Sequence, residues 1–322
     1  MVSIKDIAKK AGVSISTVSY ALNGSDRIMK ETAERITSIA NEMGYVPNGA
    51  ARMLKKRESM LIGIFITDYY GHFYGDLLQG AKEELNRRGY DLIVCSGQRS
   101  HRMIPERTFD GAIILDAAFP DAELLEYANR GHKLVVLDRE LHHPRINQVL
   151  LDNRAGATLA VEHLLSHGLE RIYAVSGPES SYDARQRMRA VRQAIERAPH
   201  ASLTEIPGSF DKASGFAAGS LIAQEYDRPA GVFCLNDEMA VGLFDYIETH
   251  TSLVVGKHIH LIGFDNIELS RYLRPRLATI DYSMRKWGAL SAEQLLKMLG
   301  GEAVETERIY VRLINGDSVK PI

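Results

Sequence analysis

The sequence predicts a small all-α unit at the amino-terminal end, followed by a larger α/β region built of two lobes. Two observations carry this prediction. Through the first 46 residues, apolar side chains recur at helical spacing and are interrupted by glycines. From Leu61 onward, short apolar runs alternate with amphipathic helical stretches, which is the pattern of a βαβ series.

Two short helices joined by a tight turn are predicted between Ile4 and Leu22. Ser3, with Asp6 three residues later, is expected to cap the first helix, and Ser14 stands where the second must begin. Gly12 fits the turn because it tolerates backbone angles that are closed to residues with a Cβ. The apolar residues at helical spacing are Ile4, Ile7, Ala8 and Ala11 in the first helix, and Val18, Ala21 and Leu22 in the second.

The outward face of the second helix is a candidate for reading DNA. Small Ala8 and branched Val18 allow the two helices to cross closely, so the opposite face stays exposed. A face of this kind can enter a major groove. An ordinary helical hairpin without a nucleic-acid role is the alternative at this point. The exposed residues are Ile15, Ser16, Thr17 and Tyr20.

A third helix is predicted over about 30–43, with an apolar stripe that covers the other two helices. Gly44 ends it. The dipeptide Pro47-Asn48 then signals another helix start, and the stretch 48–55 gives only about two turns. Isolated helices this short are marginal in water, so we expect this one to form only against a partner.

Together these motifs resemble the LacI/GalR family, that of the lactose and purine repressors. The resemblance implies a helix-turn-helix DNA-binding domain at 1–46 and a hinge helix with its linker at 47–60. It also implies a homodimer on a palindromic operator in double-stranded DNA. The matching stretches are Ile4-Lys5-Asp6-Ile7-Ala8, Ala11-Gly12-Val13-Ser14, Thr17-Val18-Ser19, Leu22-Asn23, and Gly44-Tyr45-Xaa-Pro47-Asn48 through Ala51-Arg52-Xaa-Leu54.

The resemblance places paired hinge helices in the minor groove, with Leu54 wedged into a central base step and Ala51 beside it. Such wedges kink DNA at a cost of roughly a few kcal/mol per step, offset by wider contact. In a lone helix Leu54 would be a core residue, but its neighbours Arg52 and Lys55 are basic. The DNA-binding residues implied are Ser14, Ile15, Ser16, Thr17, Ser19, Tyr20, Asn23, Asn48, Ala51, Arg52, Leu54 and Lys55.

The charge is divided unevenly along the chain. Residues 1–58 hold ten Lys and Arg against six Asp and Glu, net +4, and the rest hold 29 against 35, net −6. Phosphate contacts supply salt-dependent affinity without sequence information. The resemblance implies that Ile15, Ser16 and Tyr20, which match the family's specificity positions, read the bases. Met29 departs from the family, because many relatives have a helix-capping Ser there, and losing such a cap costs about 1 kcal/mol.

The α/β region reads as parallel strands separated by helices at 77–88, 156–167, 183–198 and 237–248. Its length exceeds one comfortable core, and the resemblance implies two lobes similar to periplasmic sugar-binding proteins. The lobes are expected at 61–153 plus about 281–304 and at 154–280 plus about 305–322, with crossings near Asn153, Ile280 and Glu305. The predicted strands are 61–66, 91–95, 111–115, 134–137, 172–175, 231–235 and 260–264.

A ligand cleft is expected where the carboxyl ends of the strands of both lobes face each other. An aromatic face at 73–74 can stack on a sugar ring or a base. The alternatives are packing between lobes for the aromatic pair and ordinary salt bridges for the charged residues. The candidate effector residues, from strand ends and family positions, are Asp68, Phe73, Tyr74, Asp138, Arg139, Asp183, Arg187, Phe210, Asn236, Asp237 and Asp265.

Arg187 and Asp265 match the ligand-gripping Arg and Asp of the family, and a guanidinium with a carboxylate can grip adjacent hydroxyls. Purine-sensing relatives place an aromatic residue after the position of Asp138, whereas this chain has Arg139. A saccharide is therefore the expected effector. The stretch 96–109, which contains Pro105, is shorter than in relatives and leaves little room for a helix.

Other features point away from an enzyme or an exported protein. The histidines lack carboxylates or thiols at ligand spacing, and no phosphate loop or nucleophile motif is present, so no metal, cofactor or catalytic residue is expected. Cys95 and Cys234 lie in apolar strands and are expected to be reduced core residues. No long apolar segment or signal peptide is found, which predicts a cytoplasmic protein at operator DNA without a membrane partner.

The predicted function is that of a ligand-responsive transcriptional repressor. A sugar-binding protein with no DNA role is one alternative, and a regulator controlled by a protein corepressor is another. The sequence leaves open the effector, the direction of its effect, the operator and the choice between dimer and tetramer, although no heptad repeat follows Ile309.

Overall fold

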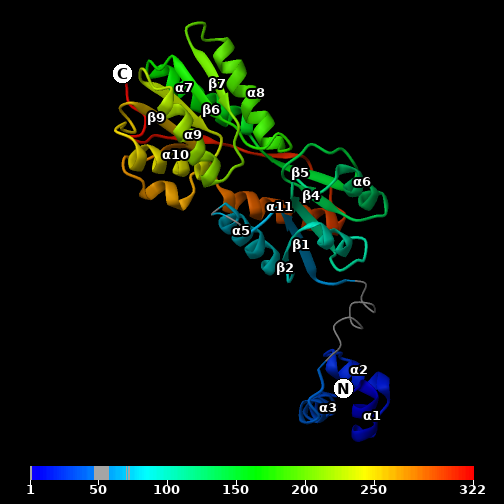
Figure 1. The fold of residues 1–322 in the computed structure, drawn as a ribbon. Coiled ribbons are helices and arrows are strands. Elements are labelled where there is room, and N and C mark those ends of the chain that lie inside the picture. The colour runs from blue at the N-terminus through cyan, green and yellow to red at the C-terminus, as the bar shows by residue number, and fades with distance from the viewer. Residues whose placement is uncertain (1, 47–57, 70, 72) are drawn as a thin grey trace. The chain divides into compact units, whose positions relative to one another are not determined.

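The computed structural model describes residues 2–46, 58–69, 71 and 73–322. The chain divides into two compact units, Met1–Ser59 and Met60–Ile322, which Figure 1 colours from blue to red along the sequence. The predicted hinge residues lie outside the described residues. They are Asn48, Ala51, Arg52, Leu54 and Lys55.

Over residues 2–46, three helices form the first unit: α1 Ile4–Ala11, α2 Ile15–Leu22 and α3 Lys30–Glu42. The predicted cap of α1 is confirmed, because the Asp6 N–H donates to Ser3 Oγ at 3.4 Å and the Ser3 N–H donates to Asp6 Oδ2 at 2.9 Å. Gly12 takes a φ of 69° at the turn. Ser14 caps α2 by accepting from the Thr17 N–H at 3.1 Å.

A small apolar core holds these helices together, with Ile7, Val18 and Ile36 fully buried. Met29 precedes α3 and makes no side-chain capping bond, which confirms the missing cap. The side chain of Arg35, on α3, instead donates to the Ala11 carbonyl at the end of α1 at 3.2 Å. The first unit is therefore fastened by one stripe from each helix and a few capping bonds.

The described residues of the second unit form two six-stranded sheets, with strand orders β11-β5-β4-β3-β1-β2 and β12-β10-β9-β8-β6-β7. All paired strands run parallel except β10 and β12, which are antiparallel. The strands are β1 Leu61–Ile66, β2 Asp91–Ser96, β3 Gly111–Leu115, β4 Leu134–Val136, β5 Ile146–Leu151, β6 Arg171–Val175, β7 Ser202–Ile206, β8 Ala230–Cys234, β9 Ile259–Phe264, β10 Ala278–Asp281, β11 Glu307–Ile309 and β12 Arg312–Ile314.

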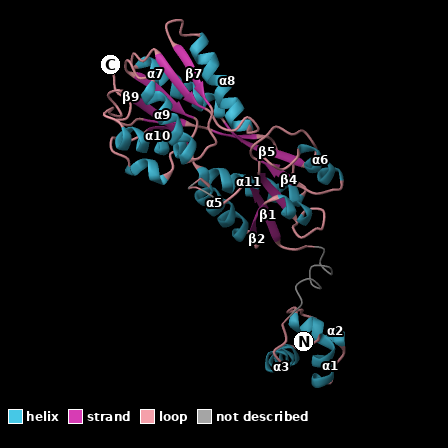
Figure 2. Ribbon diagram, in the orientation of Figure 1, coloured by secondary structure: helices cyan, strands magenta, loops and turns pink. Residues whose placement is uncertain are grey.

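Helices cover both faces of each sheet (Figure 2). In the first lobe, α5 and α11 pack on one face while α6 and the short 3-10 helix η1 pack on the other. In the second lobe, α7 pairs with α8 and α9 pairs with α10. The helices are α5 Tyr74–Arg87, η1 Gln98–Met103, α6 Asp121–Asn129, α7 Asn153–Ser166, α8 Tyr182–Glu196, α9 Lys212–Gln224, α10 Asp237–His250, η2 Glu268–Tyr272 and α11 Met284–Gly300.

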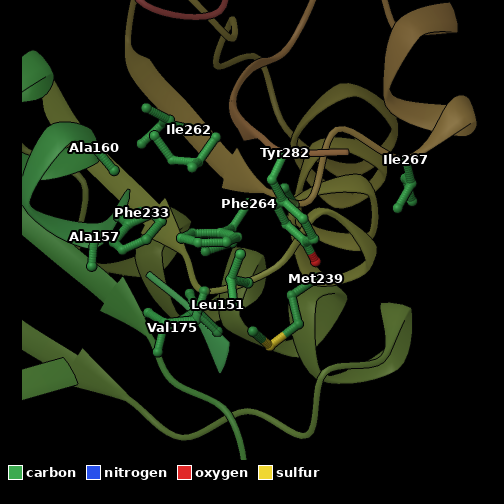
Figure 3. Close-up of a cluster of buried hydrophobic side chains, with 14 of the residues drawn as sticks. Leu151, Ala157, Ala160, Val175, Phe233, Met239, Ile262, Phe264, Ile267 and Tyr282 are labelled. Carbon is green, nitrogen blue, oxygen red and sulfur yellow. The ribbon is translucent and has the colours of Figure 1, made fainter. Parts of the chain in front are cut away.

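The core of the second lobe is built around aromatic rings at the ends of its central strands. Figure 3 shows Phe264, at the end of β9, with Tyr282 beside it, and their ring centroids lie 6.0 Å apart. Gly156 of α7 makes room for the Phe264 ring, since a Cβ at Gly156 would lie 2.5 Å from it. Tyr282, the residue after β10, therefore packs into the second lobe at the point where the chain leaves it.

The chain passes between the lobes three times. The first passage follows β5, the second follows β10, and the third lies between β11 and β12. The third differs from the expected crossing near Glu305, because β11 pairs with Val149 to Leu151 of β5 and extends the first sheet to Ile309. The parallel pairing of β11 thus keeps the chain in the first lobe for a few more residues.

All seven predicted strands are present within one residue of the expected bounds. The four predicted helices of this region are present as well; three begin one to three residues earlier than expected, and α10 begins at the expected Asp237. After Ser96, which ends β2, residues 97–109 contain only η1, as the short segment with Pro105 predicted. Cys95 and Cys234 are buried and unbridged. None of the described helices has the length and apolarity needed to cross a membrane.

Candidate functional site

The exposed face of α2 carries the residues predicted to read DNA. Ile15 is 46% exposed, although it is a large apolar residue, while Val18 on the opposite face is fully buried. Ser14 and Ser16 are exposed, and Thr17, Ser19 and Tyr20 are half-buried. The helix thus presents an apolar side chain and several hydroxyls outward.

Hydrogen bonds within the first unit already engage several of these hydroxyls. Ser14 Oγ lies 2.7 Å from Ser16 Oγ, so the orientation of the Ser16 hydroxyl is coupled to the helix cap. Asn23 donates to the Ser19 carbonyl at 2.6 Å. Arg27, which the sequence did not single out, donates to the Tyr20 hydroxyl at 3.1 Å, and its guanidinium carbon lies 5.4 Å from the Tyr20 ring centroid. Tyr20 is therefore held by a cation that can also approach a phosphate.

In the second lobe, Arg187 of α8 lies at the centre of a buried polar network. Its Nε donates to Asn153 Oδ1 at 2.8 Å, and its Nη1 donates to the carbonyl of Leu235, the residue after β8. Nη2 lies 3.8 Å from Asp265 Oδ1, which is longer than a hydrogen bond. The guanidinium carbon stands 3.6 Å from the Phe264 ring centroid. The network fixes Arg187 while leaving Nη2 able to donate to a ligand.

The carboxylates around Arg187 are held in surroundings that oppose their charge. Burial raises the pKa of Asp265 to about 7, with Arg187 and the Tyr282 hydroxyl acting in the opposite direction. Burial also raises the pKa of Asp183, although Asn153 donates to its Oδ1 at 2.6 Å. Ligand hydroxyls could supply the missing hydrogen bonds, because ionised carboxylates accept strongly from donors.

The residues around Arg187 and Asp265 form the second wall of the candidate site, on the second lobe. Backbone strain occurs in this wall. Asp265 has a φ of 107° and Phe210 a φ of 63°, values that residues with a Cβ rarely adopt. The Phe210 ring packs on Gly177, where a Cβ would lie 2.3 Å from its ring edge. Because such strain persists only where surrounding contacts over-determine it, the positions of these two side chains are closely specified by the fold.

Asn236 and Asp237 play a different part from the one expected of direct ligand contacts. Asn236 caps α10, accepting from the Met239 N–H at 3.0 Å and donating to the Phe210 carbonyl at 2.9 Å. Asp237 is fully buried and accepts from Thr279 Oγ1 at 2.7 Å and from the Ile267 N–H at 3.0 Å. Both residues tie the loops of this wall together.

In the first lobe, Asp138 and Arg139 follow β4 and form a two-bond pair. Arg139 donates from Nε to Asp138 Oδ1 at 2.9 Å and from Nη2 to Oδ2 at 3.0 Å. Its other bonds go to Asp121 Oδ1 at 2.8 Å and to the carbonyls of Asp116 and Phe119. All five N–H groups of the guanidinium thus have acceptors in their own lobe. Arg139 could reach a ligand only by giving one of them up.

The loop after β1 completes this wall. Phe73 and Tyr74 lie edge to face with ring centroids 5.1 Å apart. Burial raises the pKa of Tyr74 to about 12, and the charges of Asp68, Asp116 and Asp138 act in the same direction. The two aromatic residues and Asp68 therefore lie on the same side of the lobe as Asp138.

The two walls face each other. Asp183 of the second lobe is among the charges that raise the pKa of Asp138 in the first, although burial is the larger cause. Tyr182 of α8 donates across to Glu140 at 2.9 Å. A large cavity of about 1230 Å³ lies alongside the crossing segments, but of the predicted effector residues, all of which the structure describes, only Asp265 lines it. The convergent polar network, rather than this cavity, is the better candidate for ligand binding.

Asn153 and Tyr282 contribute to the network without having been predicted as site residues. Asn153 bridges Arg187 and Asp183, and Tyr282 donates to Asp265 Oδ1 at 2.9 Å. Both follow strands, β5 and β10, that the apolar pattern did not predict. Recognising those strands would have revealed the two residues, because ligands of such sheets bind beyond the carboxyl ends of the strands.

Comparison with known families identifies both units. The family model for bacterial regulatory proteins, lacI family, matches residues 3–48. The model for the periplasmic binding protein-like domain matches residues 161–319. One relative, the probable HTH-type transcriptional repressor ExuR of Bacillus subtilis (strain 168), is 31% identical over 318 residues, covering 96% of this chain and 95% of its own length. Another, the repressor PurR of Vibrio vulnificus (strain CMCP6), is 29% identical over 335 residues and covers both chains completely.

Solved structures agree. A sugar-binding transcriptional regulator of the LacI family from Enterococcus faecalis is 45% identical, with a TM-score of 0.78 over 82% of this chain and 99% of its own. The lac repressor dimer bound to operator and the anti-inducer ONPF is 26% identical, with a TM-score of 0.84 over 99% of both chains. These similarities span the helical unit and both lobes.

Proposed function

Because this chain belongs to the lacI family of bacterial regulatory proteins, we propose that it is a dimeric repressor that binds a palindromic operator and responds to a saccharide held between its lobes. The observation that carries the ligand part of this proposal is the pair formed by Arg187 and Asp265, buried at the strand ends of the second lobe with a 3.8 Å gap between Nη2 and Oδ1.

The DNA part of the proposal is supported by the geometry of α2. A helix that buries Val18 and exposes Ile15 and Ser16 suits insertion into a major groove, where an apolar side chain can contact a thymine methyl and a hydroxyl can donate or accept. Arg27, beside Tyr20, adds a cation that could contact the phosphates of the DNA. A solved relative, the lac repressor, was crystallised as a dimer on its operator.

A saccharide is favoured over a purine by the polarity of the cleft. The residues that converge there are carboxylates, a guanidinium and an amide, which suit a ring bearing many hydroxyls. Phe210 and the Phe73–Tyr74 pair provide aromatic faces for the apolar side of a sugar ring. One relative is named a sugar-binding regulator, but another is named PurR, so purines belong in any ligand test.

In this proposal each part of the chain has a defined role. Residues 1–46 read the operator, 47–60 form the hinge, and the two lobes, divided at the three crossings, sense the ligand in the cytoplasm. Ligand binding changes which lobe arrangement is favoured and thereby the spacing of the paired hinges. A coupling of about 1–3 kcal/mol would change operator affinity by roughly 5- to 150-fold. A protein corepressor acting on the lobes is the alternative source of the signal.

The DNA-reading role is tested by selecting binding sites from a library of random duplexes with the full-length protein. We expect enrichment of palindromes, and we expect Ile15→Ala to relax selection at one position of each half-site. Exposed Lys82→Ala, in the second unit, is the control. Enrichment of no sequence at physiological salt would contradict the proposal.

The hinge is tested by Leu54→Ala. We expect this variant to lose more affinity for an operator with a central CG step than for unrelated DNA, since a wedge acts only where the step is kinked. Titration of both DNAs by fluorescence anisotropy measures the difference. Equal losses on the two DNAs would refute the wedge.

A further inference from the structure

Tyr282 occupies the second passage between the lobes, directly after β10. Its side chain belongs to the second lobe and is 5% exposed. Its ring centroid lies 6.0 Å from that of Phe264, and its hydroxyl donates to Asp265 Oδ1 at 2.9 Å. The next residue, Ser283, caps α11 by accepting from the Lys286 N–H at 3.2 Å. One residue thus separates a ring fixed in the second lobe from a helix of the first.

Helix α11 is firmly part of the first lobe. Trp287 is fully buried and donates from Nε1 to the Val149 carbonyl of β5 at 2.7 Å. Glycines bring α11 against α5, because a Cβ at Gly80 would lie 1.9 Å from the Arg285 carbonyl oxygen and a Cβ at Gly288 would lie 1.9 Å from that of Leu77. A displacement at the start of α11 must therefore be shared with α5.

A row of aromatic rings continues from Tyr282 into the first lobe. The ring centroids of Tyr282 and Trp287 are 5.9 Å apart, and those of Trp287 and Phe73 are 6.4 Å apart. The ring centroids of Phe73 and Tyr74 are 5.1 Å apart, and both residues belong to the first wall of the proposed ligand site. The row joins Asp265, on one side of the cleft, to the aromatic pair on the other side. Rings in such contact cannot shift independently, because packed interiors leave few voids.

We propose that Tyr282 is a positioning residue that links the state of the Asp265 carboxylate to the first lobe, through its hydroxyl on one side and Trp287 on the other. A ligand hydroxyl that engages Asp265 changes the bond that Tyr282 makes, and the change is passed to α11. The inference rests on the proposed grip of Arg187 and Asp265 and deepens it by naming how the grip is felt across the crossing.

The charges around Asp265 make this link measurable without a ligand. Arg187 and Asp183 face it from α8, Asp237 and Glu238 from α10, and the Tyr282 hydroxyl from the crossing. Because burial raises the pKa of Asp265 to about 7, its charge changes within an accessible pH range. Protonation weakens Asp265 as an acceptor for Tyr282, and so mimics competition by a ligand hydroxyl.

Trp287 provides the readout, since it is the only tryptophan in the chain. We expect its emission in the ligand-free, full-length protein to show a one-proton step with a midpoint near that of Asp265. Asp265→Asn should remove the step, which also separates it from any titration of Asp237, whose pKa burial raises to about 8. In Tyr282→Phe the step should fall below half its amplitude, and its midpoint should move to higher pH because the charged form loses a donor.

Tyr173→Phe is the matched control. Tyr173 is also buried in the second lobe, and its hydroxyl donates to a carboxylate, Glu225 Oε2, at 3.1 Å, but it lies on β6 and takes no part in the row of rings. This variant should lose similar stability and keep the full emission step. If Tyr282→Phe does not fold, Tyr282→Gln, which retains a donor but no ring, should also reduce the step below half its amplitude.

The proposal is overturned if the wild type shows no step, if Asp265→Asn retains it, or if Tyr282→Phe shows the same amplitude and midpoint as the wild type. These outcomes concern the ligand-free protein and are independent of which compound binds. A failure here would leave the saccharide assignment to its own test, whereas a chain that binds no saccharide could still show the emission step.

Discussion

The two arginines of the proposed ligand site, Arg139 and Arg187, differ in the hydrogen-bond donors that they still have available. Arg139, on the first wall, has an acceptor for each of its five N–H groups within its own lobe. Arg187, on the second wall, has Nη2 at 3.8 Å from Asp265 Oδ1, and among the described residues it donates hydrogen bonds only through Nε and Nη1. Two residues with the same chemistry thus have different tasks.

This difference indicates that the second wall has donors available for a ligand, whereas the donors of the first wall are used to hold its own loops in place. Burial raises the pKa of Asp138, and Arg139 opposes that shift while joining Asp138 to the loop at 116–121, so the carboxyl group of the first wall is held in a fixed orientation. The second wall offers a donor and acceptors together.

The largest effect is expected from removing Arg187, the arginine proposed to bind the ligand. Arg187→Ala should abolish the effect of ligand on operator affinity, and should also cost about 3–5 kcal/mol of stability, because Asp265 and Asp183 then lose the cation beside them. Operator affinity without ligand should persist in the folded protein. The control is Arg189→Ala, an exposed arginine half a turn further along α8. A retained ligand response would show that the grip lies elsewhere.

A smaller effect on the ligand response is expected from removing Arg139, whose N–H groups all have acceptors in the first lobe. Arg139→Ala should lower the free energy of unfolding by about 2–4 kcal/mol, because it removes two hydrogen bonds from the buried Asp138 carboxylate and one from each of the Asp116 and Phe119 carbonyls. The ligand response should weaken but remain, and denaturant unfolding with parallel ligand titration would separate the two losses. If Arg139→Ala abolished the response while leaving stability unchanged, the contrast between the two arginines would be wrong.

The pH dependence of stability sharpens the same contrast. The pKa of Asp265 is raised in the folded protein to about 7, above that of an unfolded Asp, so its contribution to stability is present at low pH and is lost as pH rises through about 7. Unfolding free energy measured between about pH 4 and pH 8 should therefore fall less steeply in Asp265→Asn. Parallel curves for the two proteins would mean that Asp265 is ionised at no cost.

The order of elements was predictable from the sequence because the central parallel strands are buried on both faces and read as apolar runs. β5 escaped prediction because Asn147 and Gln148 interrupt its apolar pattern, yet both are 4% exposed. Their amides donate to Gln294, to the Glu305 carbonyl and to the Leu141 carbonyl, partners that only the folded chain brings near. Buried polar residues with distant partners carry no local signal.

The candidate site was partly predictable for the same reason. Arg187 lies within a helix, and Asp265 directly follows a strand, that the apolar pattern found, and the fold brings them together. Tyr282 follows β10, a strand of only four residues in which the polar Thr279 is buried and donates to Asp237. Neither the strand before Tyr282 nor the partner of Thr279 could therefore be predicted from the local sequence. Whether an arginine is saturated or available depends on carbonyls of the surrounding loops, which sequence spacing does not reveal.

The central claim is that a saccharide binds between the lobes through Arg187 and Asp265, and thermal unfolding tests it most directly. Wild type, Arg187→Ala and Arg189→Ala are unfolded with monosaccharides, disaccharides, sugar phosphates and purines. At about 100 times its dissociation constant a ligand adds about 2.7 kcal/mol, or roughly 4 °C for a chain of this size. The account predicts such a shift with a saccharide in the wild type and in Arg189→Ala, and its loss in Arg187→Ala. An equal shift in Arg187→Ala, or a shift with purines alone, would contradict it.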